Sequence, residues 1–333
     1  MKIVIVTDAW FPQVNGVVTT LNALQIELKK KNYQVVIIHP SLFKTTSFSI
    51  YPEISLAINP WKIGHYLTED MDYLHIATEG PLGLFARNFA IQNNIQFTTA
   101  IHTKFPEYFK KLLFIPLSLT YGYMRWFHGK AYRTFVNTSS QIDELSSRGF
   151  QHLTLWNRAI NKNIFYPRQK SSKQNYLLYV GRVSKEKNLE DFLKLETLKQ
   201  KIVVGSGPML SEYKKKYKTV KFVGPKFDNE LAQYYSDADV FVFPSKTDTY
   251  GIVMIEAIAC GTPVAAYPVT GPRDIIINEI NGYIHIDLHV AISHAERINS
   301  KICAESIESL SWSDVANTFE EGLIEVSHEF ITT

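Results

Sequence analysis

Short hydrophobic segments rich in valine and isoleucine recur along the chain, and helical patterns separate them. In the first half the segments span residues 2–7, 34–39, 73–78, 96–102 and 133–138. In the second half they span residues 176–182, 201–207, 220–224, 239–245, 263–268 and 282–286. Hydrophobic residues run through them without polar alternation, as strands buried on both faces of a parallel sheet require. The pattern predicts an α/β protein with two doubly wound, Rossmann-like parallel sheets.

A polar stretch at residues 163–175 separates the two series of segments and predicts the link between two domains. We expect the first domain to cover residues 1–165 and the second to cover residues 172–310. A helical pattern follows at residues 313–330, with Ser313 as a candidate N-cap. Ligands of open α/β sheets bind beyond the carboxyl ends of the strands, so we expect the functional residues there, in a cleft between the domains.

The composition agrees with two soluble domains and argues against several classes of protein. The chain has 333 residues, of which 45% are hydrophobic and 20% are charged, and its net charge is +3. Cys260 and Cys303 lack the spacing of a zinc site or a disulfide framework. Residues 1–12 do not form a signal peptide, and a proline and a glycine interrupt the apolar stretch at residues 112–123. We therefore expect a cytoplasmic protein without a nucleic-acid partner, in which any membrane contact is peripheral.

Residues 7–21 place a loop and then an apolar helix after the first predicted strand. Gly16 lies where this helix begins, and a glycine there lets a phosphate approach backbone N–H groups at the positive end of the helix dipole. A glycine in a simple turn gives the same pattern, so this loop alone does not assign a phosphate site.

Two cations follow the first strand of the second domain. Arg182 comes directly after Gly181, and Lys187 precedes the next helix. A guanidinium and an ammonium at the carboxyl end of one strand suit a diphosphate, although a solvated loop has the same composition. Further along, Gly205 and Gly207 lack the third glycine of a dinucleotide fingerprint, so we expect tight strand-to-helix packing there instead of nicotinamide binding.

Two carboxylates flank the start of an apolar helix that we expect from about residue 250 onward. Asp248 then lies at the helix mouth, where it can bind hydroxyls of a hexose. Glu256 lies about two turns inside the helix, where it can accept two hydrogen bonds from a vicinal diol such as a ribose. The structural alternative makes Asp248 a helix N-terminal charge and Glu256 the partner of a backbone group. The amides that can bind phosphate or sugar oxygens beside Asp248 belong to Thr249, Tyr250 and Gly251.

This set of motifs, in this order, resembles the retaining nucleotide-sugar glycosyltransferases of GT-B fold in glycosyltransferase family 4, over nearly the whole chain. The motifs are PQVNGVV (12–18), TEGPLG (78–83), HTKFPEY (102–108), GRVSKEKN (181–188), GSGP (205–208) and DTYGIVMIE (248–256). The resemblance implies two Rossmann-like domains that face each other across a cleft, the first for the acceptor and the second for the donor. It also implies that a C-terminal helix within residues 311–333 crosses back toward the first domain.

For the donor's diphosphate, the resemblance implies that Gly16 presents its backbone and that Arg182 and Lys187 neutralise the charge. Because these two cations stabilise the leaving diphosphate, it implies a reaction that needs neither a metal nor another cofactor. The anomeric configuration would be retained by attack on the face from which the diphosphate departs, with the diphosphate helping to deprotonate the acceptor.

For the rest of the donor, the resemblance implies that Glu256 holds the ribose and that Asp248, with the amides that follow it, holds the sugar. His102 would lie on the other side of the sugar, near the reacting carbon. Asp248 departs from the glutamate that relatives commonly have, so the hydroxyl that it reaches can differ. A second departure lies at residues 159–161, where Ala-Ile-Asn replaces Gly-Val-Asp and removes backbone freedom and one charge.

The acceptor is suggested by residues 102–133 of the first domain, where basic and aromatic residues are interleaved. Such a surface suits contact with anionic lipid at the inner face of a membrane, and the segment resembles relatives that glycosylate diacylglycerol or other lipids. A core helix with solvated lysines explains the same pattern equally well. The basic residues are Lys110, Lys111, Arg125, Lys130 and Arg133.

Together these features predict a retaining hexosyltransferase that uses a nucleotide sugar and acts on a membrane lipid such as diacylglycerol. A UDP-sugar is the favoured donor and GDP-mannose the second. Transfer to a soluble or lipopolysaccharide-type glycan is the first alternative. A nucleotide-sugar epimerase would need more acid–base groups near the sugar than His102. A non-catalytic nucleotide-sugar-binding subunit would have no need of His102 together with both cations.

Overall fold

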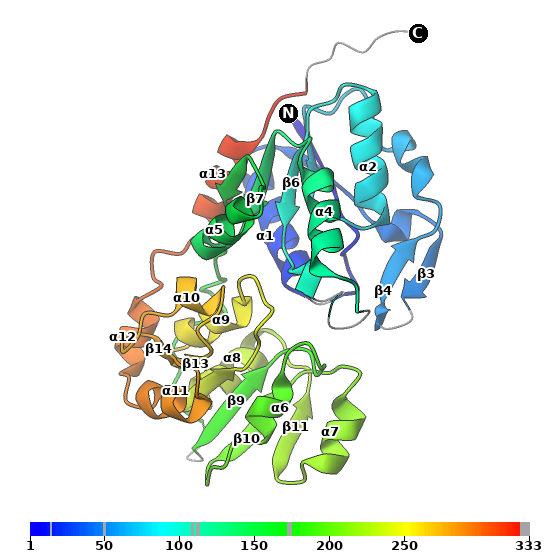
Figure 1. Cartoon of the computed structure of the whole chain (residues 1–333). Helices are drawn as coiled ribbons and strands as arrows, with labels where there is room; N and C mark the ends of the chain where they lie inside the picture. Colours follow the sequence, from blue (N-terminus) through cyan, green and yellow to red (C-terminus); the bar gives the residue numbers. More distant parts are fainter. Residues whose placement is uncertain (14, 49–50, 108–109, 111–113, 172–174, 327–333) are drawn as a thin grey trace. The chain divides into compact units, whose positions relative to one another are not determined.

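A computed structural model describes residues 1–13, 15–48, 51–107, 110, 114–171 and 175–326 of the chain. The chain divides into two compact units (Figure 1). Unit 1 contains Met1–Arg158 and the chain from Trp312 onward, and unit 2 contains Ala159–Ser311.

Unit 1 is built around a parallel sheet with the strand order β2-β1-β5-β6-β7-β8. The central strands are almost completely buried, as their continuous hydrophobic sequences predict. The order reverses between β1 and β5, so the loops after these two strands diverge and leave room for a ligand. The strands are β1 (Lys2–Val6), β2 (Gln34–Ile38), β5 (Tyr73–Ile76), β6 (Thr98–Ile101), β7 (Arg133–Val136) and β8 (Leu153–Leu155).

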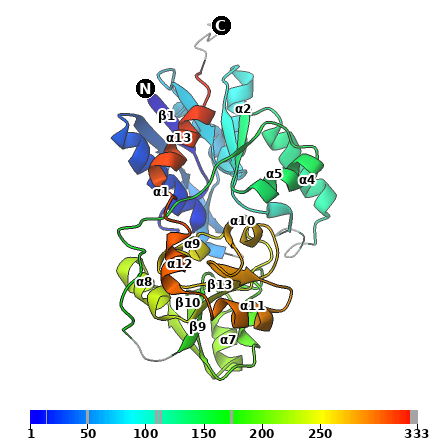
Figure 2. The ribbon, with the colours of Figure 1, turned by 90° about the vertical axis from the view of Figure 1, so that its left-hand side faces the viewer.

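Helices cover both faces of this sheet. Its α-helices include α1 (Gly16–Lys30), α2 (Pro81–Gln92), α4 (Leu117–His128), α5 (Ser139–Ser147) and α13 (Trp312–Gly322). A peripheral antiparallel hairpin is formed by β3 (Thr45–Phe48) and β4 (Tyr51–Ala57), between the 3-10 helices η1 (Pro40–Leu42) and η2 (Pro60–His65). Helix α13 packs against α1, and Figure 2 shows the two side by side.

Unit 2 is a second parallel sheet, with the strand order β11-β10-β9-β12-β13-β14. Its reversal point lies between β9 and β12. The strands are β9 (Tyr176–Val180), β10 (Gln200–Val204), β11 (Val220–Gly224), β12 (Val240–Phe243), β13 (Val264–Ala266) and β14 (Gly282–Ile284). The helices are α6 (Leu189–Leu193), α7 (Leu210–Lys216), α8 (Asp228–Asp237), α9 (Ile252–Ala259), α10 (Pro272–Ile275), α11 (Leu288–Ala295) and α12 (Ser300–Glu305).

The prediction of two doubly wound parallel sheets is confirmed, but the element boundaries differ in places. Unit 2 begins at Ala159, six residues before the predicted end of the first domain at residue 165, because Ile160, Ile164 and Phe165 pack onto the core of unit 2. The last helix starts at Trp312 and ends at Gly322, so Ser313 lies inside the helix and is not its N-cap. The helix was predicted to continue to residue 330, of which residues 327–330 lie outside the described part of the chain.

No helix in the described part of the chain is long and apolar enough to span a bilayer.

Candidate active site

The reversal point of unit 2 brings together the loops that follow β9 and β12. The loop after β9 carries Gly181, Arg182 and Lys187, and the loop after β12 carries Asp248. Arg182 is half-buried, and its carbonyl oxygen accepts a hydrogen bond from the Tyr179 hydroxyl at 2.8 Å. This is the position at which doubly wound sheets bind nucleotides.

Lys187 and Asp248 form an ion pair across this reversal point, between Nζ and Oδ1. Both side chains are mostly buried, with exposed fractions of 22% for Lys187 and 17% for Asp248. The second carboxylate oxygen of Asp248 is buried and has no hydrogen-bond partner among the described residues. The structure therefore places one predicted diphosphate ligand and the predicted sugar ligand in direct contact.

Helix α9 begins two residues later than the sequence predicts, at Ile252, and Gly251 is the residue before it. Gly251 has a φ of 89°, and a Cβ there would lie 2.8 Å from Met254 Cε and 3.0 Å from Phe243 Cζ. Glycine is thus required by both backbone conformation and space. Glu256 consequently lies little more than one turn inside the helix, instead of the predicted two turns.

Glu256 is held by Tyr235 of α8, whose hydroxyl donates a 2.9 Å hydrogen bond to Oε2. Tyr235 is fully buried, and Glu256 as a whole residue is half-buried. Burial raises the pKa of Glu256 to about 7, and the hydrogen bond from Tyr235 opposes part of that rise. Oε2 of Glu256 therefore has a protein partner. This partner is the phenol of Tyr235, whereas the structural explanation from the sequence named a backbone group.

The GSGP segment has a packing role, but it packs against a neighbouring loop and not strand against helix as the sequence predicts. Gly205 follows β10, and a Cβ there would lie 2.0 Å from the carbonyl oxygen of Gly181. At Gly207, a Cβ would lie 2.4 Å from the carbonyl oxygen of Val183. Both glycines also have φ values in the positive region, at 137° and 159°. They allow this loop to pass close to the Arg182 loop and so fix its path.

In unit 1, His102 follows β6 and is half-buried. Its Nδ1 lies 2.8 Å from a terminal nitrogen of Arg158, which comes just after β8. Burial and the charge of Arg158 lower the pKa of His102 well below its ordinary value. The imidazole is therefore neutral at physiological pH.

The TEGPLG segment shapes the loop after β5 and the start of α2. Asp8, which follows β1, accepts hydrogen bonds from the Thr78 hydroxyl at 2.8 Å and from the Leu82 amide at 2.8 Å. A Cβ on Gly80 would lie 2.5 Å from Asp8 Cγ, and one on Gly83 would lie 1.8 Å from the Thr78 carbonyl oxygen. The glycines thus let the buried carboxylate of Asp8 cap α2 and join the two sides of the reversal point in unit 1.

Gly16 is the first residue of α1, as predicted, but the helix already has a cap. Asn15 Oδ1 accepts from the amides of Val17 and Val18 at 3.0 and 3.1 Å. Two first-turn amides are thus satisfied within the loop, and the cap does not use the Gly16 amide. The diphosphate role of Gly16 stays a prediction.

Two protein-family models match consecutive parts of the chain. The model described as Glycosyltransferase Family 4 matches residues 14–163, and the model described as Glycosyl transferases group 1 matches residues 161–302. The chain belongs to the family 4 glycosyltransferases. A GDP-mannose-dependent alpha-mannosyltransferase of Corynebacterium glutamicum is 24% identical over 85% of this chain and 76% of that protein. An alpha-monoglucosyldiacylglycerol synthase of Streptococcus pneumoniae is 26% identical over 87% of this chain and 76% of that protein.

Solved structures support the GT-B fold of this glycosyltransferase. Sucrose-phosphate synthase from Thermosynechococcus elongatus matches with a TM-score of 0.80 at 19% identity, over 96% of this chain and 97% of that chain. The Anabaena protein HepE in complex with UDP and glucose matches with a TM-score of 0.69 at 14% identity, over 96% and 98%. The predicted fold is therefore confirmed, and the family models together with the relatives confirm the predicted hexosyltransferase class.

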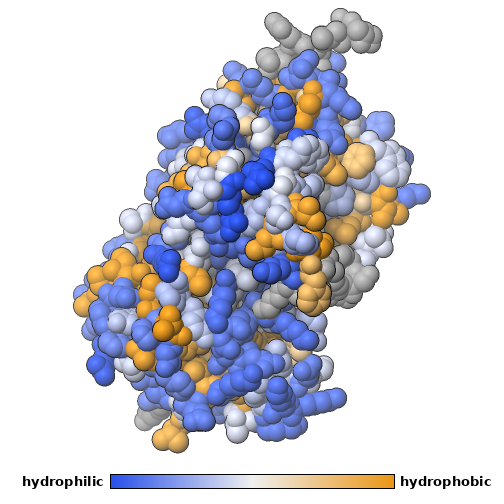
Figure 3. All heavy atoms as spheres, viewed as in Figure 1, coloured by the Kyte–Doolittle hydropathy of each residue, from blue (hydrophilic) through white to orange (hydrophobic). Residues whose placement is uncertain are grey.

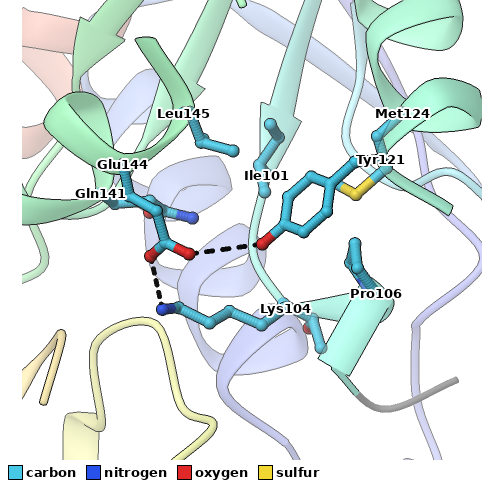
Figure 4. Close-up of a pocket in the computed structure, with 9 residues that line it drawn as sticks. Ile101, Lys104, Pro106, Tyr121, Met124, Gln141, Glu144 and Leu145 are labelled. Atoms are coloured by element: carbon cyan, nitrogen blue, oxygen red, sulfur yellow. Dashed lines mark hydrogen bonds and ion pairs between the residues drawn. The ribbon is translucent and has the colours of Figure 1, made fainter. Parts of the chain in front are cut away.

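A small pocket lies beside β6 in unit 1 of the glycosyltransferase, close in sequence to His102 (Figure 4). Lys104 crosses its mouth and forms a 2.6 Å ion pair with Glu144 of α5. Tyr121 of α4 points to the same carboxylate at 3.3 Å and donates to Glu107 at 2.7 Å. These contacts connect residues 104–107 to α4 and α5, so they fix the segment that follows His102.

The residues that hold the predicted ligands were not found from the sequence. Tyr235 lies in a different helix from Glu256, and Arg158 lies in the loop of the Ala-Ile-Asn departure. A signal for Arg158 existed, because an arginine close to Trp156 and directly before the hydrophobic pair Ala159 and Ile160 is unusual. In the described residues, no group of three or more His, Cys, Asp and Glu side chains could hold a metal ion, and metal independence stays a prediction.

Proposed function

We propose that this glycosyltransferase moves a hexose from a UDP-sugar to a hydroxyl group of a membrane lipid such as diacylglycerol, with retention of configuration and without a metal. GDP-mannose is the second candidate donor, in line with the mannosyltransferase relative. The observation that carries the proposal is the convergence of two cations and a carboxylate at the reversal point of unit 2.

In this proposal the donor's diphosphate lies at the carboxyl end of β9. Arg182 supplies a forked donor and Lys187 a point charge, which together neutralise the leaving group as its charge develops. The amides of Thr249, Tyr250 and Gly251 lie beside the start of α9, where the helix dipole favours sugar or phosphate oxygens. Glu256 accepts from the ribose hydroxyls through the oxygen that Tyr235 leaves available.

In this proposal, donor binding replaces the Lys187–Asp248 ion pair by contacts of both residues with the donor. A diphosphate competes with Asp248 for the ammonium group because it carries the larger negative charge. Once Lys187 turns to the diphosphate, both oxygens of Asp248 can accept hydrogen bonds from the sugar hydroxyls. Binding of the diphosphate thereby makes Asp248 available to bind the sugar.

The chemistry follows from the same residues. The bond between the anomeric carbon and the diphosphate oxygen breaks, and Arg182 and Lys187 stabilise the diphosphate that leaves. The acceptor hydroxyl attacks from the same face, and its proton passes to a diphosphate oxygen. No protein nucleophile is needed in this scheme. His102 would donate a hydrogen bond to the sugar near the reacting carbon.

A lipid acceptor is supported by the exposed face of α4 in unit 1. Leu119, Tyr123 and Trp126 lie at helical spacing, with exposed fractions of 66%, 39% and 51%, and the opposite face of α4 is buried. Lys110 and Lys130 are also exposed, whereas Lys111 lies outside the described residues. Figure 3 shows hydrophobic and weakly polar residues at the surface over this part of unit 1. Aromatic residues with nearby cations suit an anionic membrane surface, and the glucosyldiacylglycerol synthase relative supports a lipid acceptor.

The donor is tested by thermal shift with UDP, GDP, ADP and their sugar conjugates in the presence of EDTA. A ligand that binds only the folded chain raises its melting temperature, and we expect the largest shift for UDP or UDP-hexose. Replacement of both cations, Arg182→Ala with Lys187→Ala, should abolish the shift, while Lys185→Ala, which changes an exposed lysine of the same loop, should keep it. If none of the nucleotides or nucleotide sugars raised the melting temperature, the donor proposal would be refuted.

The acceptor is tested by flotation with anionic and with zwitterionic vesicles, followed by transfer of labelled sugar to diacylglycerol in those vesicles. We expect flotation with anionic vesicles only. Leu119→Ser with Trp126→Ser should weaken it, and Leu198→Ser, which changes a fully exposed leucine of unit 2, should not. Wild-type protein that stays with neither vesicle and transfers sugar only to soluble glycans would favour the glycan alternative.

A further inference from the structure

Three strand ends of unit 1 meet around one guanidinium group. His102 follows β6, Asn137 follows β7, and Arg158 lies just beyond β8. One terminal nitrogen of Arg158 contacts both His102 Nδ1 and Asn137 Oδ1. Arg158 is only 2% exposed, which makes it the kind of buried cation that needs a specific set of partners.

The orientation of Arg158 is fixed from several directions. Its other terminal nitrogen donates to the carbonyl oxygens of Trp156 at 3.0 Å and Asn157 at 3.3 Å. The guanidinium carbon lies 4.3 Å from the centre of the Trp156 ring, over which the group stacks. The guanidinium therefore faces His102 as part of the fold, with acceptors on its remaining sides.

The contact with Arg158 determines which nitrogen of His102 carries the proton. A guanidinium group has only donors, and it stays protonated in proteins. At 2.8 Å from this donor, Nδ1 of His102 must be the acceptor, so the proton of the neutral ring lies on Nε2.

We infer that Arg158 is a positioning residue that fixes His102 as the neutral Nε2–H tautomer, so that His102 binds the transferred sugar as a hydrogen-bond donor and does not act as a general base. This inference rests on the proposed function for the identity of the sugar. The tautomer itself rests only on the contacts within unit 1. An Nε2–H group can donate to a sugar hydroxyl or ring oxygen but cannot remove a proton from the acceptor.

The charged and titratable groups that act on His102 all favour its neutral form. They are Arg158, whose permanent charge opposes protonation, and two further histidines, His75 and His128. His75 is completely buried and donates to or accepts from the Thr98 hydroxyl at 2.9 Å. We therefore expect His102 to keep one protonation state across the whole physiological pH range.

The tautomer is measured on the wild-type protein by nitrogen NMR of labelled histidine, with the His102→Gln variant used to assign the signal among the 10 histidines. We expect a bare Nδ1 and a protonated Nε2 that do not change between about pH 5.5 and 8. A protonated Nδ1, or a His102 that titrates within this range, would overturn the inference. This experiment needs no turnover, so a protein with this tautomer but no transferase activity would refute the proposed function and leave the tautomer assignment standing.

The role of the arginine is measured with Arg158→Met, which removes the donor and keeps much of the side-chain volume. We expect His102 of this variant to titrate closer to the ordinary histidine value of about 6.5, and the pH profile of kcat to gain an acid limb. The KM for the donor should change less than kcat. Arg158→Lys should restore part of the wild-type profile because it keeps a permanent donor. If Arg158→Met fails to fold, the nitrogen spectrum of the wild-type protein decides whether His102 is the Nε2–H tautomer. If the variant folds and its His102 signal is unchanged, the positioning role of Arg158 is refuted.

Discussion

His102 of unit 1 and Glu256 of unit 2 are two predicted substrate ligands with closely similar surroundings and opposite acid–base behaviour. Each is half-buried, and each contacts a buried side chain, Arg158 at 2.8 Å from His102 and Tyr235 at 2.9 Å from Glu256. The partner of His102 is a permanent cation, which adds to burial and drives the pKa far below neutrality. The partner of Glu256 is a neutral phenol, and burial prevails over its hydrogen bond, so the pKa rises to about 7.

Burial is the largest cause of both shifts, and it moves the pKa of a base and of an acid in opposite directions. The charge of Arg158 adds to the effect of burial on His102, whereas the hydrogen bond from Tyr235 opposes it at Glu256. Burial together with a fixed cation removes His102 from the pH response, whereas burial leaves Glu256 poised between two protonation states near neutrality. Any pH dependence of the enzyme near neutrality is therefore expected to arise from donor binding in unit 2. The following changes test this contrast.

The largest effect is expected from His102→Ala. Loss of one hydrogen bond that strengthens in the transition state should lower kcat by about 10²- to 10³-fold, with little change in the affinity for the nucleotide. Turnover with saturating donor and isothermal titration with UDP measure the two quantities. His65→Ala replaces an exposed histidine of the same unit and should leave both unchanged. If His102→Ala weakened nucleotide binding as much as Glu256→Ala does, the division of roles would be wrong.

Glu256→Ala should act mainly on binding. Loss of hydrogen bonds from the ribose to a carboxylate should weaken nucleotide affinity by roughly 10- to 100-fold. The affinity is measured by titration with UDP and with uridine, because the ribose contact is common to both. Glu230→Ala, an exposed carboxylate of α8, serves as the control and should bind normally.

Acid should affect the stability of the two units in opposite directions. Burial lowers the pKa of His75 from 6.5 to about 3, so protons bind the unfolded chain more readily and stability is lost as pH falls below 6.5. By pH 5 this group alone removes roughly 2 kcal/mol from unit 1. The raised pKa of Glu256 has the opposite sign, since its contribution is present below the unfolded value of 4.5 and is lost as pH rises through about 7.

Hydrogen exchange of peptides from each unit at pH 7 and pH 5, corrected for intrinsic rates, measures this difference. We expect protection in unit 1 to fall relative to unit 2 on acidification. His75→Gln, which stays neutral, should reduce the change in unit 1. Equal changes in both units would contradict the assignment.

The smallest effect is expected in the pH dependence of donor affinity. The ribose hydroxyls donate to the ionised form of Glu256, so affinity should fall about tenfold per pH unit below 7 and level off above it. Titration with an intact nucleotide sugar avoids the terminal phosphate of UDP, which also ionises near neutrality. Glu256→Gln should flatten the curve, and Tyr235→Phe should move its midpoint upward because it removes the hydrogen bond that favours the carboxylate. An unchanged curve in Glu256→Gln would assign the titration to another group.

The sequence predicts the central parallel strands well because they are continuous hydrophobic runs that are almost completely buried. It does not reveal β8, which has three half-buried residues, or the hairpin β3–β4, whose first strand is TTSF and which lies at the edge of the unit. These elements depend on tertiary neighbours more than on local pattern. The end of unit 1 at Arg158 was not predicted for the same reason. Ile160 and Phe165 pack onto the core of unit 2, and this contact depends on residues that are distant in the sequence.

For the site, the motif residues could be located from the sequence, and their partners could not. Arg158 lies 56 positions from His102, and Tyr235 lies 21 positions from Glu256. Neither spacing is a helical or strand period, because each pair joins side chains from different elements. The ion pair between Lys187 and Asp248 was likewise not foreseen, since the two were assigned to different parts of one donor.

Helix α13 also has a consequence for how the chain is made. It brings Phe319 into contact with Phe135, and Phe319 packs edge-on to His75 with ring centres 4.9 Å apart. The Trp156 indole donates to the Val315 carbonyl oxygen at 3.0 Å. The core of unit 1 thus stays open during synthesis until α13 has left the ribosome, whereas unit 2 is one uninterrupted stretch of chain and can close first. During translation, the half of the enzyme that begins first is therefore expected to finish folding last.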